Sequence, residues 1–296
     1  MRSSAFNLSI LLIAIILYSC KEENSNINLK PQYADTTLID TTYVSDSSVT
    51  PQTKMILIED FTGVNCQNCP KAAQKIEDIQ ALYPNRILAT AIHSTETKKL
   101  GFLDGSKSDY RTPAGKDIYL MLGLLGGIGA FPTGAVNRTI HNDGSSNLVF
   151  QSYSTWSTFV DQELTKPSIV NIYLSGSFID TSDIYKVKVK LHYTQARSDT
   201  EAISIFLIED HIIDLQNVSN VTDSHYVHNH ILRNTFTNAT GDVLNASLVK
   251  DRVFEKEYKM DIDPTWVRAN CKIIAFVHRK GSYYMDILQA WQKPLL

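Results

Sequence analysis

The sequence predicts two folded parts, an α/β domain over residues 54–166 and an all-β domain over residues 167–296. In the first part the apolar run Met55–Ile58 predicts a buried strand, and apolar residues then recur at helical spacing. In the second part apolar and polar residues alternate in several short runs, which is typical of strands with one buried face. Pro167 separates the two patterns, so we place the domain boundary there.

The N-terminus has the features of an export signal. Its apolar stretch, Ala5–Tyr18, is short for a membrane span and fits the hydrophobic region of a signal peptide. The stretch ends at Leu17-Tyr18-Ser19-Cys20, which resembles the lipobox of bacterial lipoproteins. This resemblance implies removal of residues 1–19 as a signal peptide and lipidation of Cys20, which would attach the chain to a membrane. The alternatives are an ordinary signal peptide and a buried apolar segment whose cysteine is incidental.

The residues after Cys20 indicate where the anchored protein is sent. Lys21-Glu22-Glu23 resembles the signal that exports Bacteroidetes lipoproteins to the outside of the outer membrane. We therefore expect a lipid-anchored outer-membrane protein exposed at the cell surface, with a periplasm-facing anchor as the alternative. Residues 20–53 are rich in Asn, Ser, Thr and Asp and lack helical periodicity, so we expect a flexible tether.

Charge and composition narrow the partners. The chain has 28 basic and 31 acidic residues, a balance that does not favour binding to nucleic acid. We expect no cofactor. His225, His228 and His230 lie close together, but no second ligand cluster accompanies them, so we do not expect a metal site.

The motif that carries chemistry is Cys66-Gln67-Asn68-Cys69, between the predicted strand and the predicted helix. A Cys-x-x-Cys in this position is the thioredoxin-type arrangement, and an oxidising compartment allows a Cys66–Cys69 disulfide to persist. In the reduced protein the helix N-terminus would lower the pKa of the Cys66 thiol. Asp60 lies where thioredoxins keep a buried acid, whose raised pKa suits proton transfer. The alternative for Asp60 is an acid that caps a turn.

A second thioredoxin-like feature is Phe131-Pro132-Thr133. It follows a predicted strand at Arg86–His93, a predicted helix at 113–125 and a glycine-rich turn. It resembles the cis-proline loop that faces the Cys-x-x-Cys in thioredoxin-like proteins, which implies a cis Phe131–Pro132 bond and a backbone at Phe131 that binds an extended substrate. A trans proline in a glycine loop is the alternative. A final helix is predicted near 147–164.

The sequence departs from thioredoxins at the motif itself. Asn65 replaces the tryptophan usual before the first cysteine, and Gln67-Asn68 replaces the usual intervening pairs. These departures leave the redox potential and the choice of partner open.

The second part predicts about seven strands, which fits an immunoglobulin-like sandwich. The predicted strands lie around 170–175 and 186–193 and at Ala202–Ile208, His230–Thr237, Val253–Met260, Lys272–His278 and Tyr283–Trp291.

The sequence also resembles the Bacteroidetes outer-membrane lipoprotein family named for its twenty-eight-kilodalton member. The resemblance rests on four segments, namely Thr62-Gly63 before the Cys-x-x-Cys, Tyr110–Gly115, Phe131–Arg138 and Tyr226–Arg233. It implies an outer-membrane lipoprotein, with surface adhesion or binding suggested as its role.

Two functions follow as hypotheses. In the first, the protein is a thiol–disulfide oxidoreductase acting on a protein dithiol or disulfide. Cys66 attacks the substrate, Cys69 resolves the mixed disulfide, Asp60 moves the proton, and Phe131, Pro132 and Thr133 hold the substrate backbone. In the second, the Cys66–Cys69 bond is a structural disulfide in a non-enzymatic lipoprotein that binds a surface ligand.

Overall fold

The computed structural model describes residues 38–97, 100–124, 130–142, 147–179, 182–281 and 284–296. The expected signal peptide, the lipidation site Cys20 and the export signal at Lys21-Glu22-Glu23 lie outside the described residues. Among the described residues, no helix is long and apolar enough to cross a membrane.

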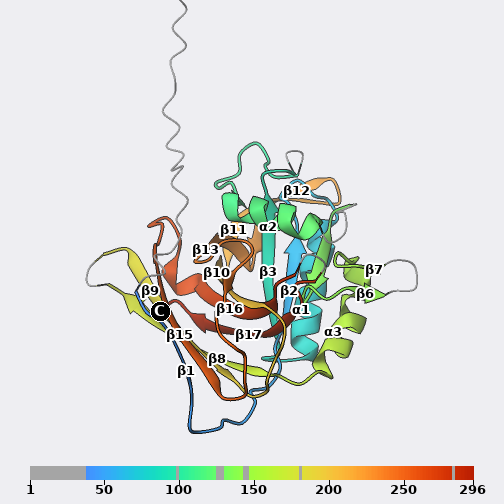
Figure 1. The fold of residues 1–296 in the computed structure, drawn as a ribbon. Coiled ribbons are helices and arrows are strands. Elements are labelled where there is room, and N and C mark those ends of the chain that lie inside the picture. The colour runs from blue at the N-terminus through green and yellow to red at the C-terminus, as the bar shows by residue number, and fades with distance from the viewer. Residues whose placement is uncertain (1–37, 98–99, 125–129, 143–146, 180–181, 282–283) are drawn as a thin grey trace, which may run out of the picture. The chain divides into compact units, whose positions relative to one another are not determined.

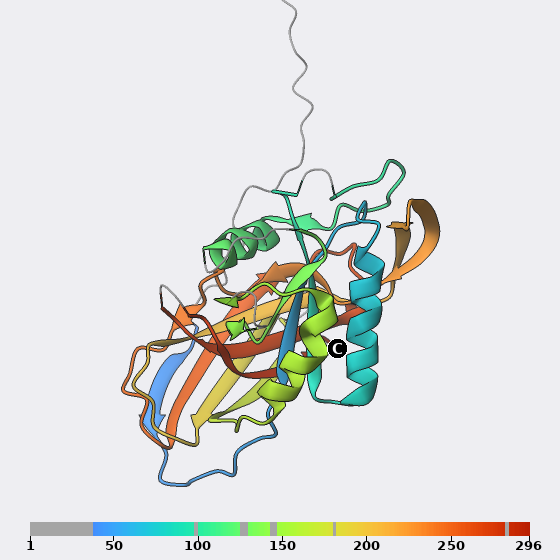
Figure 2. The same cartoon turned by 90° about the vertical axis from the view of Figure 1, so that its right-hand side faces the viewer.

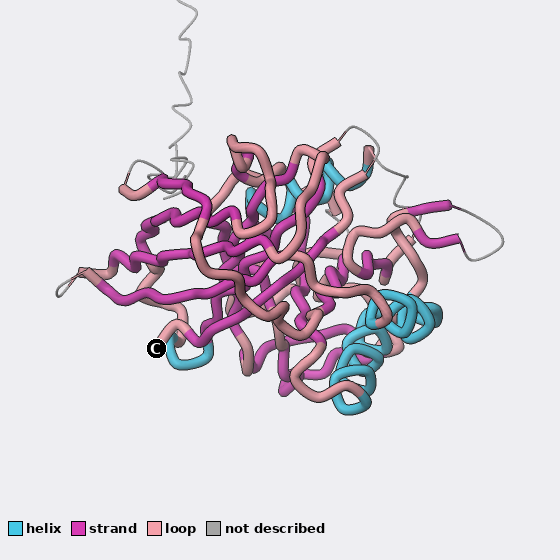
Figure 3. Tube along the Cα trace, turned by 60° about the horizontal axis from the view of Figure 1, so that its bottom comes forward, coloured by secondary structure: helices cyan, strands magenta, loops and turns pink. Residues whose placement is uncertain are grey.

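The described chain is mostly β, a sandwich of sheets with few helices (Figures 1 and 3). The larger sheet has the order β17-β16-β10-β13-β3-β2-β5, with β14 and β4 paired beside this path. Its strands are β2 (Ile56–Phe61), β3 (Ile87–Ser94), β4 (Arg111–Thr112), β5 (Thr133–Val136), β10 (Glu201–Glu209), β13 (Ile231–Thr235), β14 (Asp242–Val243), β16 (Cys271–Arg279) and β17 (Ile287–Pro294).

The smaller sheet covers one end of the larger one and has the order β1-β15-β9-β8. Its strands are β1 (Asp40–Val44), β8 (Val170–Phe178), β9 (Ile184–Tyr193) and β15 (Arg252–Asp261). Alternation along β10 decides what each side chain meets. Ile203, Ile205 and Leu207 pack in one cluster with the smaller sheet, while Phe206 and Ile208 pack on the opposite side with residues of β2 and α2 (Pro113–Gly123).

The other end of the larger sheet is covered by helices. β2 and β3 pair in parallel, and β5 pairs antiparallel with β2. α1 (Cys69–Leu82) and α3 (Trp156–Leu164) pack on one face of these strands, and α2 packs on the other (Figure 1). The helix predicted near 147–164 is wrong in its first half, since a short strand β7 (Asn147–Leu148), paired with β6 (His141–Asn142), and a 3-10 turn (Tyr153–Thr155) precede α3.

The larger sheet is continuous across the expected domain boundary at Pro167. Ile231 of β13 pairs in parallel with Ala91 of β3, and the Ala91 N–H donates to the carbonyl of His230 at 2.7 Å. Strands from the second half of the sequence therefore extend the sheet of the first half. The division of the chain into two domains between residues 166 and 167 therefore stays a prediction.

Residues 38–53 correct the expectation of a tether over 20–53. β1 pairs with β15, and the Asp40 carboxylate accepts a bond from the Lys256 ammonium at 2.7 Å. Gln52 then bonds with Asn171 and with the backbone of Ile172. The run Thr41-Thr42-Tyr43-Val44 is rich in residues that favour strands, although its polar composition suggested a loop.

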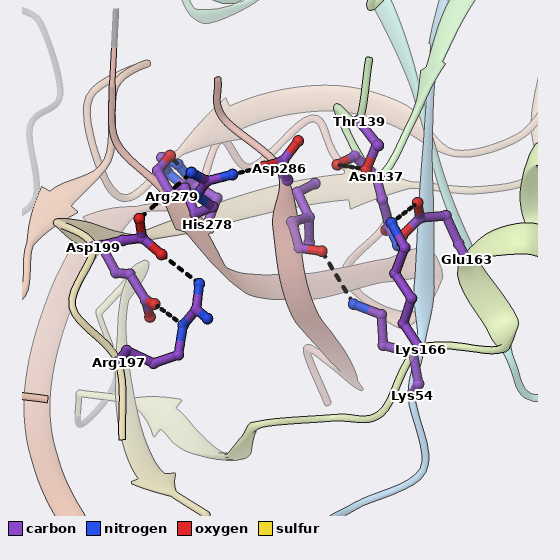
Figure 4. A network of polar contacts seen from close by, with 12 residues as sticks. Lys54, Asn137, Thr139, Glu163, Lys166, Arg197, Asp199, His278, Arg279 and Asp286 are labelled. Carbon is purple, nitrogen blue, oxygen red and sulfur yellow. Dashed lines mark hydrogen bonds and ion pairs between the residues drawn. The ribbon is translucent and has the colours of Figure 1, made fainter. Parts of the chain in front are cut away.

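A polar network fastens the start of β2 to β17 (Figure 4). The buried ammonium of Lys54 donates to the carbonyls of Ile287, at 3.0 Å, and Leu288, and burial lowers its pKa to about 8. The Asn137 carboxamide accepts from the Leu57 N–H at 2.9 Å and donates to Glu163 of α3 at 3.1 Å. The first three of these contacts join side chains to backbone groups of β2 and β17.

Arg138 and Glu59 form an ion pair with neither side chain exposed to solvent. Two hydrogen bonds of 2.7 and 2.6 Å join the guanidinium to both carboxylate oxygens, and the guanidinium also lies 4.9 Å from the ring centre of Phe276 in β16. A bidentate geometry of this kind offsets part of the cost of burying two charges.

Replacing Arg138 with Met removes the partner of a buried carboxylate. We expect Arg138→Met to lower the free energy of unfolding by about 3–5 kcal/mol, measured by urea denaturation. Lys116→Met is the matched control, because Lys116 pairs with Glu96 at the surface and such pairs contribute about 0–1 kcal/mol. Equal losses in the two variants would contradict the importance of the buried pair.

Candidate functional site

The two cysteines of the Cys-x-x-Cys are joined in a disulfide bond. Cys69 is the first residue of α1, and Cys66 lies in the loop between β2 and this helix. The exposed fraction is 5% for Cys66 and 2% for Cys69. The lowered pKa expected for the Cys66 thiol concerns the reduced protein and stays a prediction.

The loop before Cys66 is held close to residue 100. The Asn65 N–H donates to the carbonyl of Leu100 at 2.8 Å, and the Cys66 N–H donates to the carbonyl of Gly63 at 3.1 Å. A Cβ atom on Gly63 would lie 2.5 Å from the Leu100 carbonyl oxygen. Only glycine therefore allows this approach of the two chains.

Asp60 lies one residue before the end of β2 and is buried. Alternation places it on the same face as Ile56 and Ile58, which pack under α1. Burial raises the pKa of its carboxyl to about 8, and among the described residues its Oδ1 has no hydrogen-bond partner. A buried acid that is neutral at pH 7 can give a proton to a neighbouring group.

The Phe131–Pro132 peptide bond is cis, as the resemblance implies. Thr133 is the first residue of β5 and pairs with Phe61, the last residue of β2. The proline loop and the Cys66 loop therefore lie at the same end of these two strands. The Thr133 hydroxyl donates to the carbonyl of Gln151.

A pocket of about 330 Å³ lies beside Cys66. It brings together Cys66 and Phe131 of the predicted site, whereas Cys69, Asp60, Pro132 and Thr133 are not among its lining residues. The lining consists of Asn65, Cys66, Gln67, Asn68, Leu100, Phe131, Asn217 and Asn220.

Two of these residues belong to a hairpin that the sequence analysis did not predict, β11 (Ile212–Val218) and β12 (Val221–His228). The N–H groups of Asn217 and Ser219 donate to the carbonyls of Val64 and Gln67, at 2.9 and 3.0 Å. In Figure 2 the hairpin, in orange, stands beside the end of α1 that carries the cysteines. The second half of the chain therefore completes the site.

Side chains strengthen this contact. The Gln216 carboxamide donates to the carbonyls of Gly63 and Cys66, at 3.3 and 3.2 Å. The Asn217 carboxamide donates to Asn65 at 3.1 Å and accepts from the N–H of Asn220 at 2.9 Å. The available sequence signal was Ser219-Asn220, a pair with positive φ in a two-residue turn between Val218 and Val221.

A row of aromatic rings, buried at His93, Tyr110 and His228 and half-buried at Tyr226, connects β12 to segments that are distant in the sequence. The ring centres of His93 and Tyr110 lie 5.5 Å apart, those of Tyr110 and His228 4.9 Å, and those of His228 and Tyr226 4.8 Å. The guanidinium of Arg233 lies 5.4 Å from the ring centre of Tyr110. Residues from Tyr110–Gly115 and Tyr226–Arg233, two of the segments behind the family resemblance, thus meet here.

These histidines are uncharged at neutral pH. Burial lowers the pKa of His93 to about 3 and that of His228 to about 4. His228 bonds to the carbonyl of Leu215, and His230 bonds to Asp210. In the part of the chain that the structure describes, no group of three or more His, Cys, Asp or Glu side chains could hold a metal ion.

Comparisons with known proteins identify the family. The family described as Outer membrane protein Omp28 matches residues 126–294. The matched region begins after the Cys-x-x-Cys. Among solved structures, HBP35 of Porphyromonas gingivalis is similar with a TM-score of 0.64 and 18% identity, covering 84% of this chain and 76% of that one. This likeness shows a shared fold.

A weaker likeness is to protein AGR_C_4864 from Agrobacterium tumefaciens, with a TM-score of 0.46 and 15% identity, covering 82% of this chain and 95% of that one. A comparison with curated proteins found no match. Because the family match spans more than half of the sequence, the chain belongs to the Omp28 family of outer membrane proteins.

Proposed function

We propose that this outer-membrane protein is a thiol–disulfide oxidoreductase whose reacting bond is Cys66–Cys69. The observation that carries the proposal is the pocket that joins Cys66 to Phe131, the residue before the cis-proline. Further support comes from the parallel pair β2–β3 and from α1, which begins at Cys69. The proposal includes a thioredoxin-like unit over residues 54–166 and an immunoglobulin-like sandwich over 167–296.

The exchange starts from the disulfide form. A substrate thiolate attacks the sulfur of Cys66, the Cys66–Cys69 bond breaks, and Cys69 leaves as a thiolate. A second substrate thiolate then attacks the mixed disulfide and releases Cys66, so the substrate is oxidised to a disulfide as the protein is reduced to a dithiol. Exchange with another disulfide in the oxidising compartment restores the starting form.

Asp60 supplies the proton for the first step. Its carboxyl is neutral at pH 7 because burial raises its pKa to about 8. Alternation along β2 places Asp60 on the face of the sheet that packs against α1, whose first residue is Cys69. We assign to Asp60 the transfer of a proton to the Cys69 thiolate as that sulfur leaves. Phe131 lies at the pocket, where its backbone pairs with an extended substrate segment, and Pro132 and Thr133 fix the position of that backbone.

The second candidate is a non-enzymatic surface lipoprotein that binds a ligand and uses Cys66–Cys69 as a structural disulfide. The observation that favours it is the low exposure of both cysteines under the hairpin. The two candidates differ in whether the disulfide exchanges with an external thiol.

Single-cysteine variants separate the candidates. Cys69→Ser leaves a Cys66 thiol at the pocket, so we expect it to capture peptides that contain a disulfide as a mixed disulfide, detected by mass spectrometry. Cys66→Ser should capture little, because Cys69 is not among the pocket residues. The double variant Cys69→Ser/Cys271→Ser is the control and should capture as much as Cys69→Ser does, because Cys271 is buried and burial raises its pKa to about 12. Capture by neither Cys66 nor Cys69 would favour the structural disulfide.

The buried Asp60 predicts a specific pH dependence of stability. An aspartate in the unfolded chain has a pKa of about 3.9, so between about pH 4 and pH 8 the folded protein holds the extra proton. The free energy of unfolding therefore falls as the pH rises through this window. Asp60→Asn is neutral at every pH and should remove that decrease, as measured by urea denaturation. Asp46→Asn, at an exposed site, is the control, and curves parallel to wild type for Asp60→Asn would contradict the assignment.

We also propose that lipid on Cys20 attaches the protein to the outer membrane with its folded part at the cell surface. The lipobox and Lys21-Glu22-Glu23 support this arrangement. Cys20→Ser should move the protein from the membrane fraction to the soluble fraction. Protease added to intact cells should digest the wild-type protein, and protection until the outer membrane is opened would show that the anchor faces the periplasm.

A further inference from the structure

We propose that the hairpin β11–β12 determines substrate choice, and that Asn217 and Asn220 select an extended polypeptide segment with uncharged residues beside the reacting cysteine. This inference rests on the proposed function. It adds to the exchange reaction a recognition surface contributed by the second half of the chain.

The chemistry of the pocket carries the argument. Five of its eight lining residues end in a carboxamide, two are apolar, one is Cys66, and none is charged. A carboxamide both donates and accepts hydrogen bonds, so it matches the N–H and C=O groups of an extended backbone. A charged side chain brought into this lining would lose water without meeting an opposite charge, which is unfavourable.

The size of the pocket restricts the occupant. A volume of about 330 Å³ lies at the small end of ligand sites, which span roughly 300–1,000 Å³. Such a space admits a short stretch of chain around one cysteine. Cys66 lines the pocket, so a bound segment that contains a cysteine can react with it.

The hairpin is a prepared surface, because it is already fixed to the Cys66 loop. Two backbone bonds, from Asn217 and Ser219, and two bonds from the Gln216 carboxamide join the hairpin to that loop. At its other end Asp214 accepts from the N–H groups of Lys107 and Ser108 and from the Tyr110 hydroxyl. Because the hairpin is fixed at both ends, it loses little conformational entropy when a polypeptide segment binds beside it.

Substitution of Asn220 can add a charge to the lining of the pocket without disturbing the fold. It is exposed, sits in the turn with a φ of 68°, and contributes its backbone N–H to the bond with Asn217. Aspartate has nearly the same shape and also tolerates this conformation, so Asn220→Asp adds one negative charge to the pocket. Asn238→Asp is the matched control, an exposed turn asparagine that accepts a bond from Thr240 and does not line the pocket.

The experiment measures how fast short synthetic peptides open the Cys66–Cys69 bond of the full-length protein. The peptides carry one cysteine flanked on both sides by Ser, Lys or Glu, and freed Cys69 is alkylated and quantified by mass spectrometry. We expect the wild type to react fastest with the Ser-flanked peptide. In Asn220→Asp the ratio of the Lys-flanked to the Glu-flanked rate should rise about fivefold or more over the wild-type ratio, and in Asn238→Asp it should not change. Comparing ratios between variants cancels the different thiol pKa values of the peptides.

Two results would overturn the inference while leaving the proposed function intact: equal ratios in wild type and Asn220→Asp, or the same shift in Asn220→Asp and Asn238→Asp. The proposed function itself would fail if no peptide and no small thiol, such as 2-mercaptoethanol, opened the disulfide in the wild-type protein.

Discussion

The contact on which the site depends is the pair of backbone hydrogen bonds from the β11–β12 hairpin to the Cys66 loop. They join Asn217 to Val64 and Ser219 to Gln67, so the hairpin holds the residues on both sides of Cys66. The pairing of β13 with β3 brings the hairpin to this position, because β13 follows it directly in the chain. The site is therefore built from both halves of the sequence, although the cysteines belong to the first.

Two adjacent acids on β2 illustrate how the two faces of the sheet differ. Glu59 meets Arg138 in a buried, bidentate ion pair. Asp60 points to the opposite face, where burial raises its pKa to about 8 and where its Oδ1 has no partner among the described residues. The first acid stabilises the fold, whereas the second costs stability at neutral pH. Strongly shifted pKa values are common at functional sites, and the shift at Asp60 therefore supports the proton-transfer role proposed for it.

Local sequence signals predicted the first half of the site well. The apolar runs at β2 and β3 and the helical spacing after Cys69 are short-range patterns, and the structure has these elements. The order of the elements also predicted a proline loop that faces the Cys-x-x-Cys, and in the structure Phe131 and Cys66 line the same pocket. Such features follow from residues that lie close together in the chain, so a single sequence contains them.

Other features depend on contacts between distant residues. β1 forms because Asp40–Val44 pairs with the edge of β15, about two hundred residues later in the chain. The polar composition of this segment alone suggested a tether. The continuous sheet requires Ile231 to pair with Ala91. The hairpin has a recognisable turn at Ser219-Asn220, but nothing local indicates that it binds the Cys66 loop. Pairing between strands that are distant in the chain therefore could not be predicted from the local sequence patterns.

The most direct test of the central claim is the reduction potential of the Cys66–Cys69 pair in the folded protein. It is obtained by equilibrating the protein in glutathione or dithiothreitol buffers, alkylating the free thiols and measuring the reduced fraction by mass spectrometry. A disulfide that exchanges with substrates should have a potential above about −300 mV, within the range of exchange-active pairs. A potential well below about −300 mV, typical of structural disulfides, would contradict the account.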